Sequence, residues 1–295
     1  MASKFETSID FRNPIWNRDT WARIQGDLNP ENERIGYAAG EILGVKPGEA
    51  AKPLCGYEVF LATRLIPQED GNYRRLNKEV IFYTDLNPDP GSRRMIDKWT
   101  NPWTDEEVDV VHVANDPFNY TISDTLILAP EDFPTDGSPP KMRKIPLMFP
   151  WRQVGDKLML STDMHLCYPN SLQPDKWPRE SSGPLAQVSE MMRYWIDVAD
   201  VENPDLTSIA YQGTWSRITP WLPWMLMGME PGHCVYLGLM AGGPSNSRDI
   251  VPQHVQDFAN DRYPGMLSSP TEDYGPSISS LEYYAKNQTP APVKD

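Results

Sequence analysis

The feature that most constrains the fold is a series of short segments in which apolar and polar residues alternate, separated by turns rich in Pro and Gly. Residues 57–66 alternate in this way and end at Pro67-Gln-Glu-Asp-Gly71, and residues 76–84 end at the turn 85–91. Such alternation is typical of strands with one buried face. The 30 prolines among 295 residues are about twice the usual share of roughly 5% and disfavour long helices. The sequence therefore predicts a mainly β fold, an antiparallel barrel or a strongly curled meander sheet of about nine strands.

The chain is expected to form one main domain. Residues 1–54 are predicted to be an N-terminal appendage with a short helix that begins at Asn17 or Asp19, and residues 55–295 a single β-barrel-like domain. Residues 187–198 fit a strand or a helix, and their Trp, Tyr, Ile and Val content favours a strand. C-terminal helices are expected over residues 249–259 and 278–286.

Charge and composition limit the classes of binding partner and the cellular location that we expect. The net charge of −14 disfavours nucleic acid and anionic membrane surfaces. The sequence has no apolar run that could span a bilayer and no N-terminal secretory signal. Three cysteines without Cys-x-x-Cys spacing, Cys55, Cys167 and Cys234, are typical of a reducing compartment. We expect a cytoplasmic protein, and the sequence leaves homo-oligomerisation open.

The usual cofactor motifs are absent. The sequence contains no phosphate-binding Gly-Lys-Ser/Thr loop, no Gly-x-Gly-x-x-Gly, no Gly-x-Ser-x-Gly elbow and no His-Glu-x-x-His. We therefore expect neither a nucleotide or flavin cofactor nor a metal.

Four residues are candidates for proton transfer. His112 alternates with valines and would face a barrel interior, where an imidazole is a suitable acid or base. His165 shares a strand face with Asp163, which could orient the imidazole. Glu190 shares a face with Met192 and Tyr194, where a carboxyl group can have a raised pKa. The alternatives are a buried structural histidine, a solvated strand face and a surface glutamate.

The segment Trp215–Gly228 is expected to be the wall or lid of a hydrophobic site. It places three Trp, two Pro, two Met and one Arg in fourteen residues, which combines rigid and adaptable contact surface. Ordinary core packing is the alternative. The residues expected to bind a substrate are Trp103, Tyr168, Tyr194, Trp215, Arg217, Trp221, Trp224 and Met227.

Four stretches resemble a known family. They are residues 77–85, 99–104, 110–117 and 215–228, in this order, and they look like the signature stretches of a bacterial and fungal family known only as domain of unknown function 1838. The resemblance covers roughly residues 55 to 285. Asp105 stands where relatives often have Gly, which a turn accommodates. The resemblance implies relatedness but no reaction and no catalytic residues.

These observations favour an enzyme without a cofactor: a lyase, isomerase or cyclase, pericyclic cyclisation included. Its substrate would be a lipophilic, oxygenated small molecule of specialised metabolism or of aromatic or terpenoid turnover. The alternative is a non-catalytic carrier of a similar molecule. A hydrolase is disfavoured because no nucleophile–base pair is recognisable.

Overall fold

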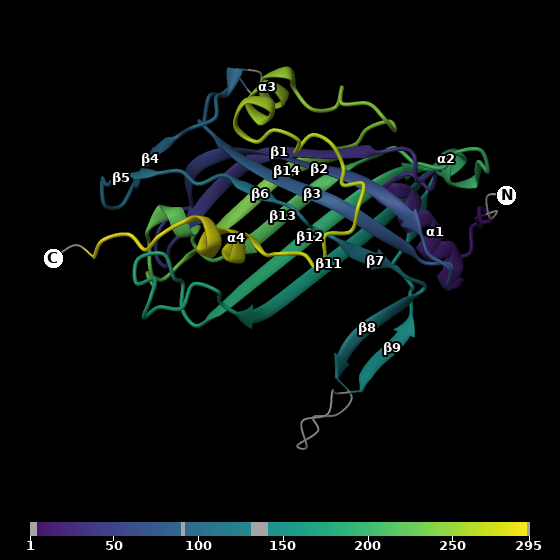
Figure 1. Cartoon of the computed structure of the whole chain (residues 1–295), viewed down its shortest axis with the longest axis horizontal. Helices are drawn as coiled ribbons and strands as arrows, with labels where there is room; N and C mark the ends of the chain where they lie inside the picture. The colour runs from purple at the N-terminus through teal and green to yellow at the C-terminus, as the bar shows by residue number, and fades with distance from the viewer. Residues whose placement is uncertain (1–4, 90–91, 131–140, 294–295) are drawn as a thin grey trace.

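The computed structural model describes residues 5–89, 92–130 and 141–293, and they form a mainly β structure (Figure 1). Most strands belong to one large antiparallel sheet, and two strand pairs lie outside it. The helices are α1 (Pro14–Gln25), α2 (Val198–Glu202), the 3-10 helix η2 (Pro223–Met225), α3 (Gln253–Arg262) and α4 (Ser280–Asn287). The separate pairs are β4 (Lys98–Thr100) with β5 (Glu107–Asp109), and β8 (Thr125–Pro130) with β9 (Met142–Pro146).

The first and the last strand of the large sheet, β1 and β14, pair near its centre. Its order is β10-β11-β12-β13-β14-β1-β2-β3-β6, and β7 also pairs with β3. The strands are β1 (Arg34–Val45), β2 (Lys52–Pro67), β3 (Tyr73–Thr84), β6 (Val113–Asn115), β7 (Tyr120–Ile122), β10 (Arg152–Val154), β11 (Lys157–Pro169), β12 (Leu185–Asp197), β13 (Tyr211–Thr219) and β14 (His233–Gly242). The sheet curls, but no sheet among the described residues closes into a barrel. The mainly β antiparallel fold is thus confirmed, and closure is not.

Residues 1–54, expected as an appendage, supply the central strand β1, which pairs with both β14 and β2. The alternation of β1 is obscured by glycines. A Cβ on Gly40 would lie 2.0 Å from the carbonyl oxygen of Leu237, so this position needs a residue without a side chain. The alternation pattern did not predict β1 because glycines are typical of turns. In the structure these glycines allow the neighbouring strands to approach closely.

The helices differ from expectation mainly at their starts. α1 begins after Asn13, whose side chain accepts hydrogen bonds from two backbone N–H groups as an N-cap. Asn17 and Asp19, the expected caps, lie inside the helix and are buried. The strand expected over residues 187–198 is confirmed as β12, and the helix expected over 278–286 is confirmed as α4.

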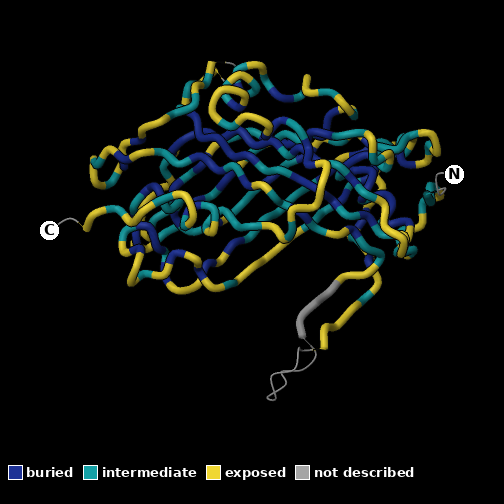
Figure 2. The backbone as a smooth tube through the Cα atoms, viewed as in Figure 1, coloured by how far each residue is buried: buried dark blue, intermediate teal, exposed yellow. Residues whose placement is uncertain are grey.

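The sheet has two covered faces. On the convex face α3 packs over Phe60 and Phe82 of the sheet through Val255 and Phe258. α1 lies against one end of the sheet, and α4 crosses the front (Figure 1). Burial is concentrated along the strands of the large sheet, whereas β9 is largely exposed (Figure 2). The concave face is therefore the one left to surround a cavity.

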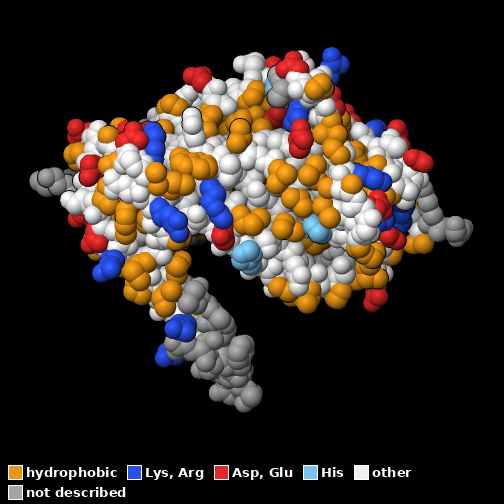
Figure 3. All heavy atoms as spheres, turned by 180° about the vertical axis from the view of Figure 1, so that it is seen from behind, with side chains coloured by type: hydrophobic (Ala, Val, Ile, Leu, Met, Phe, Trp, Pro, Cys, Tyr) orange, Lys and Arg blue, Asp and Glu red, His pale blue; other side chains and the backbone are white. Residues whose placement is uncertain are grey.

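The outer surface seen from behind carries apolar groups interspersed with charges of both signs (Figure 3). Exposed apolar side chains on β14 include Leu237 and Leu239. None of the helices in the described ranges is long and apolar enough to cross a membrane.

Candidate functional site

A cavity of about 690 Å³ lies on the concave face of the large sheet. This volume is in the range that holds a small molecule of drug-like size. Its walls come from the sheet, from α1, from the Trp221–Trp224 turn and from the C-terminal segment before and within α4. The apolar and aromatic wall residues include Trp21, Val59, Ile81, Tyr83, Val113, Met192, Tyr194, Trp215, Trp224, Tyr236 and Met240.

Strand register places the polar side chains of the cavity. Glu190 of β12 lies directly opposite Arg217 of β13, and Arg217 lies opposite Tyr236 of β14. Side chains opposite each other on one sheet face lie within contact distance. One row across three strands thus carries a carboxylate, a guanidinium and a phenol into the cavity.

Glu190 and Arg217 form an ion pair, with Arg217 Nη1 3.4 Å from Glu190 Oε1. The guanidinium also lies 6.0 Å from the centre of the Tyr236 ring. Burial works against the charge on Arg217, but the nearby acidic groups, Glu190 first and then Tyr236 and Glu79, together outweigh it and raise the pKa of Arg217. Arg217 Nε is buried and has no hydrogen-bond partner. Arg217 therefore remains cationic, and its Nε–H has no acceptor among the described residues.

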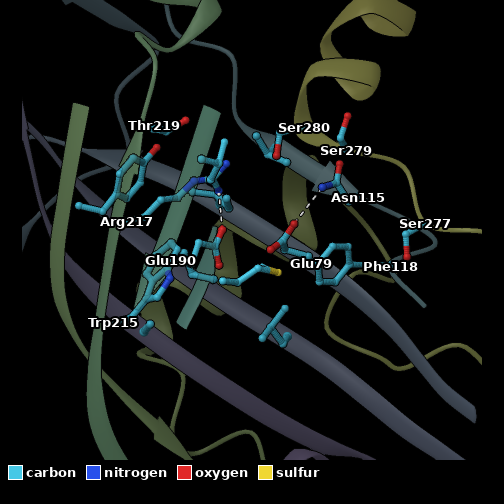
Figure 4. A pocket seen from close by; sticks show the side chains of 18 of the residues that line it. Glu79, Asn115, Phe118, Glu190, Trp215, Arg217, Thr219, Ser277, Ser279 and Ser280 are labelled. Atoms are coloured by element: carbon cyan, nitrogen blue, oxygen red, sulfur yellow. Dashed lines mark hydrogen bonds and ion pairs between the residues drawn. The ribbon is translucent and has the colours of Figure 1, made fainter. Parts of the chain in front are cut away.

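Glu79 is a second carboxyl group in the same cavity, carried by β3. Its Oε2 accepts a hydrogen bond of 2.9 Å from Asn115 Nδ2 on β6. Burial raises the pKa of Glu79, and the charge of Glu190 raises it further, while Arg217, the Asn115 hydrogen bond and the more distant Arg75 oppose the rise. Figure 4 shows both carboxyl groups directed into the same space, Glu190 beside Arg217 and Glu79 beside Asn115.

The two carboxyl groups thus have different surroundings. One is paired with a cation and the other with a neutral amide in a buried position. Pairs of carboxyl groups in unlike environments are typical of sites in which one acts as the acid and the other as the base. The arrangement is suited to moving a proton at one atom of a bound molecule and supplying a proton at another.

The structure brings most of the predicted site residues together. Those that line the cavity are Asp163, Tyr168, Glu190, Tyr194, Trp215, Arg217, Trp221 and Trp224. The residues that do not line it are Trp103, His112, His165 and Met227.

His112 lies on the convex side, under α3. Its ring packs against Phe82 and Phe258, with ring centres 5.5 and 5.3 Å away. Its Nδ1 accepts a hydrogen bond of 3.1 Å from the backbone N–H of Tyr83, and burial lowers its pKa to about 4. His112 is therefore a buried histidine with a backbone partner, which was the alternative in the sequence analysis, and it does not face the cavity.

His165 and Asp163 do not interact as an orienting pair. Asp163 binds Arg193 in an ion pair, and the exposed His165 shares a hydrogen bond of 2.9 Å with Ser189 Oγ. Each side chain therefore has a partner on the neighbouring strand β12.

The Trp215–Gly228 segment is both wall and core. Trp215 packs edge-on against Tyr57 at 5.4 Å, and Trp224 packs against Tyr83 and Trp99 at 5.1 and 5.5 Å. These indoles also line the cavity, so the same side chains belong to the hydrophobic core and to the cavity wall. Trp103 packs on Trp221 from outside the cavity wall.

Sequence reasoning missed Glu79, Asn115 and Tyr236. A signal for Glu79 was present, because it alternates with Asn77, Ile81 and Tyr83 on one face of β3, and two of these are large apolar residues. Asn115 is 36 positions away from Glu79 in the sequence, and only the β3–β6 pairing brings the two together. Within the described residues, no group of three or more His, Cys, Asp or Glu side chains is placed to hold a metal ion.

One known protein family matches the chain over nearly the whole of the fold that carries the cavity. A family of proteins of unknown function, DUF1838, matches residues 32–288, which include the whole large sheet and α4. The chain belongs to this family. No curated protein matches it.

Proposed function

We propose that the protein is an enzyme that needs no cofactor and transfers protons within a lipophilic, oxygenated small molecule, as an isomerase, lyase or cyclase. The observation that carries this proposal is the placement of Glu79 and Glu190 in one largely apolar cavity with unlike partners. The cavity size and its aromatic walls support a lipophilic substrate. The carboxyl pair supports acid–base chemistry.

In the proposed mechanism the two carboxyl groups act on neighbouring atoms of the substrate. The Glu190 carboxylate removes a proton from the carbon next to a carbonyl group. Glu79, whose pKa is raised by burial, acts in its protonated form and donates its proton to the carbonyl oxygen, and an enol results. In an enol conjugated with a further double bond, Glu190 returns its proton to the far carbon of the conjugated system while Glu79 takes back the O–H proton, which completes an isomerisation. In an elimination the β carbon loses its leaving group, which takes the proton from Glu190, while Glu79 takes back the O–H proton as the carbonyl group re-forms. Arg217 holds Glu190 in place, and its positive charge at the cavity wall would stabilise a developing oxyanion.

The second candidate is a carrier of the same kind of molecule, since the cavity alone would serve binding. Proton exchange separates the two functions, because a carrier leaves carbon-bound hydrogen atoms untouched.

Cys55, Cys167 and Cys234 are free thiols, which supports the cytoplasm as the place of action. A small-molecule ligand, rather than nucleic acid or a membrane, remains the proposed partner.

The test is hydrogen–deuterium exchange at the acidic carbon of 2-tetralone, a lipophilic ketone, in D2O, followed by NMR. We expect the protein to accelerate exchange, and Glu190→Gln to reduce the accelerated rate at least about 100-fold, the scale of general-base catalysis. Glu79→Gln is expected to reduce it less. Asp109→Asn, which removes an exposed carboxylate that is paired with Lys98 and does not line the cavity, is the matched control and should retain the rate. Binding of 2-tetralone without accelerated exchange would favour the carrier.

A further inference from the structure

A second polar region lies at the end of the cavity closed by α1. It consists of Arg75 of β3, Tyr120 of β7, Tyr194 of β12 and Tyr211 of β13, which together we call the tyrosine pole. All four residues line the cavity. Tyr120 lies opposite Arg75 in the β3–β7 pairing, and the rings of Tyr194 and Tyr211 pack edge-on at 5.0 Å.

Arg75 is a buried cation without a carboxylate partner. Only 3% of it is exposed. Its Nη2 donates to Thr63 Oγ1 at 3.0 Å, and the guanidinium lies 4.9 Å from the centre of the Tyr120 ring. The Nε–H is buried and has no acceptor. Every ion pair found in the described part of the chain uses another cation.

The nearby Arg34 shows what a structural arginine looks like in this protein. Its guanidinium donates to the backbone carbonyls of Arg23, Ile24, Ile209 and Gly243. These bonds use most of the five donors of the group. Arg75 has no such set of carbonyls, so a structural role alone does not account for its burial. A buried charge normally has a compensating partner.

The surrounding tyrosines add donors rather than negative charge. Burial raises the pKa of Tyr120, Tyr194 and Tyr211, so the three phenols stay neutral and keep their O–H groups at neutral pH. Tyr120 Oη donates to Gln25 Oε1 at 3.2 Å. Tyr194 Oη donates to Met192 Sδ at 3.3 Å. The tyrosine pole therefore consists of neutral phenols and one positive charge, and none of its four side chains is anionic. An anionic oxygen group is the complementary ligand.

We propose that the tyrosine pole binds a carboxylate of the substrate, so that the substrate class is a lipophilic carboxylic acid with its reacting carbon near Glu79 and Glu190. Arg75 and Glu79 are four residues apart on the same face of one strand, about 13 Å between Cα atoms. An acid with an apolar chain of intermediate length would bridge this separation. The location of the reacting carbon rests on the proposed function, whereas carboxylate binding at Arg75 does not.

The test compares 6-phenylhexanoate with 6-phenylhexan-1-ol, which differ only in the terminal group, by calorimetric titration of the full chain at pH 7.5. The wild type is expected to bind the acid at least about 10-fold more tightly than the alcohol, as a charge-assisted hydrogen bond in a buried site would give. Arg75→Gln should remove the preference because it weakens the binding of 6-phenylhexanoate and leaves the binding of the alcohol unchanged. Arg75→Lys, which keeps the charge, should retain part of it.

The control is Arg74→Gln, which removes a cation of the same strand that is paired with Asp273 and does not line the cavity, and it should leave the preference unchanged. Unchanged binding of the alcohol by Arg75→Gln shows that the variant is folded. An equal affinity of the wild type for acid and alcohol overturns the inference, and so does a preference that survives Arg75→Gln. A preference without exchange on 2-tetralone would keep the carboxylate site and reject the catalytic proposal, and exchange without a preference would do the reverse.

Discussion

Acid should destabilise the protein through His112, and the structure gives the size of the effect. The side chain is 5% exposed, and its pKa is lowered from the ordinary value of 6.5 to about 4 by burial. Between these two values the unfolded chain binds a proton at His112 and the folded chain does not. The free energy of unfolding therefore decreases as the pH falls from 6.5 to about 4. At about 1.4 kcal/mol for each pH unit, the loss amounts to ~3 kcal/mol.

The matched variant is His112→Asn, whose side-chain oxygen can replace Nδ1 as the acceptor for the Tyr83 N–H. Urea unfolding, followed by tryptophan fluorescence, would give the free energy of unfolding of both proteins at pH 7.5 and 4.5. The carboxylates titrate in the same way in the wild type and in His112→Asn, so the difference between the two free energies of unfolding reports on His112 alone. We expect the advantage of the wild type at pH 7.5 to shrink by about 2–3 kcal/mol at pH 4.5. A difference that does not depend on pH would refute the buried, neutral state of His112.

Two further predictions concern stability. Trp224→Ala removes a 2% exposed indole that packs on Tyr83 and Trp99, and thermal or urea unfolding should show a loss of about 3–5 kcal/mol; a loss below ~1 kcal/mol would contradict its role in the core. Arg34→Leu leaves four buried carbonyl groups without their donor, so we expect a loss of at least ~3 kcal/mol, and a variant of wild-type stability would show that water replaces the guanidinium at no cost.

The alternating pattern was sufficient to predict the mainly β fold, because side chains on a strand face follow the two-residue period whatever the partner strand. It was not sufficient for β1, whose glycines remove the apolar signal. Gly40 illustrates the reason: a Cβ there would lie 2.0 Å from the carbonyl oxygen of Leu237 on β14. Close approach of this kind depends on the curl of the whole sheet and cannot be recognised in a single strand.

The candidate site was predicted in part for a similar reason. Glu190 and Arg217 were recognised because each stands beside aromatic or Met residues in its own strand. His112 was assigned to an interior because it alternates with valines, but its side chain lies under α3. Local alternation gives two faces and does not tell which one is concave. Glu79 depends on its partner Asn115 from a distant strand, which no local pattern contains.

The central claim is that Glu79 is the acid and Glu190 the base of one site, and titration of the Glu79 carboxyl tests it most directly. Carbon-13 NMR of the protein labelled at glutamate Cδ, with the signal assigned through Glu79→Gln, would follow this group alone. We expect its pKa to lie above the ordinary value of 4.5. The pKa should fall when Glu190→Gln removes the neighbouring negative charge. A Glu79 that titrates at or below 4.5 and does not respond to Glu190→Gln would contradict the claim.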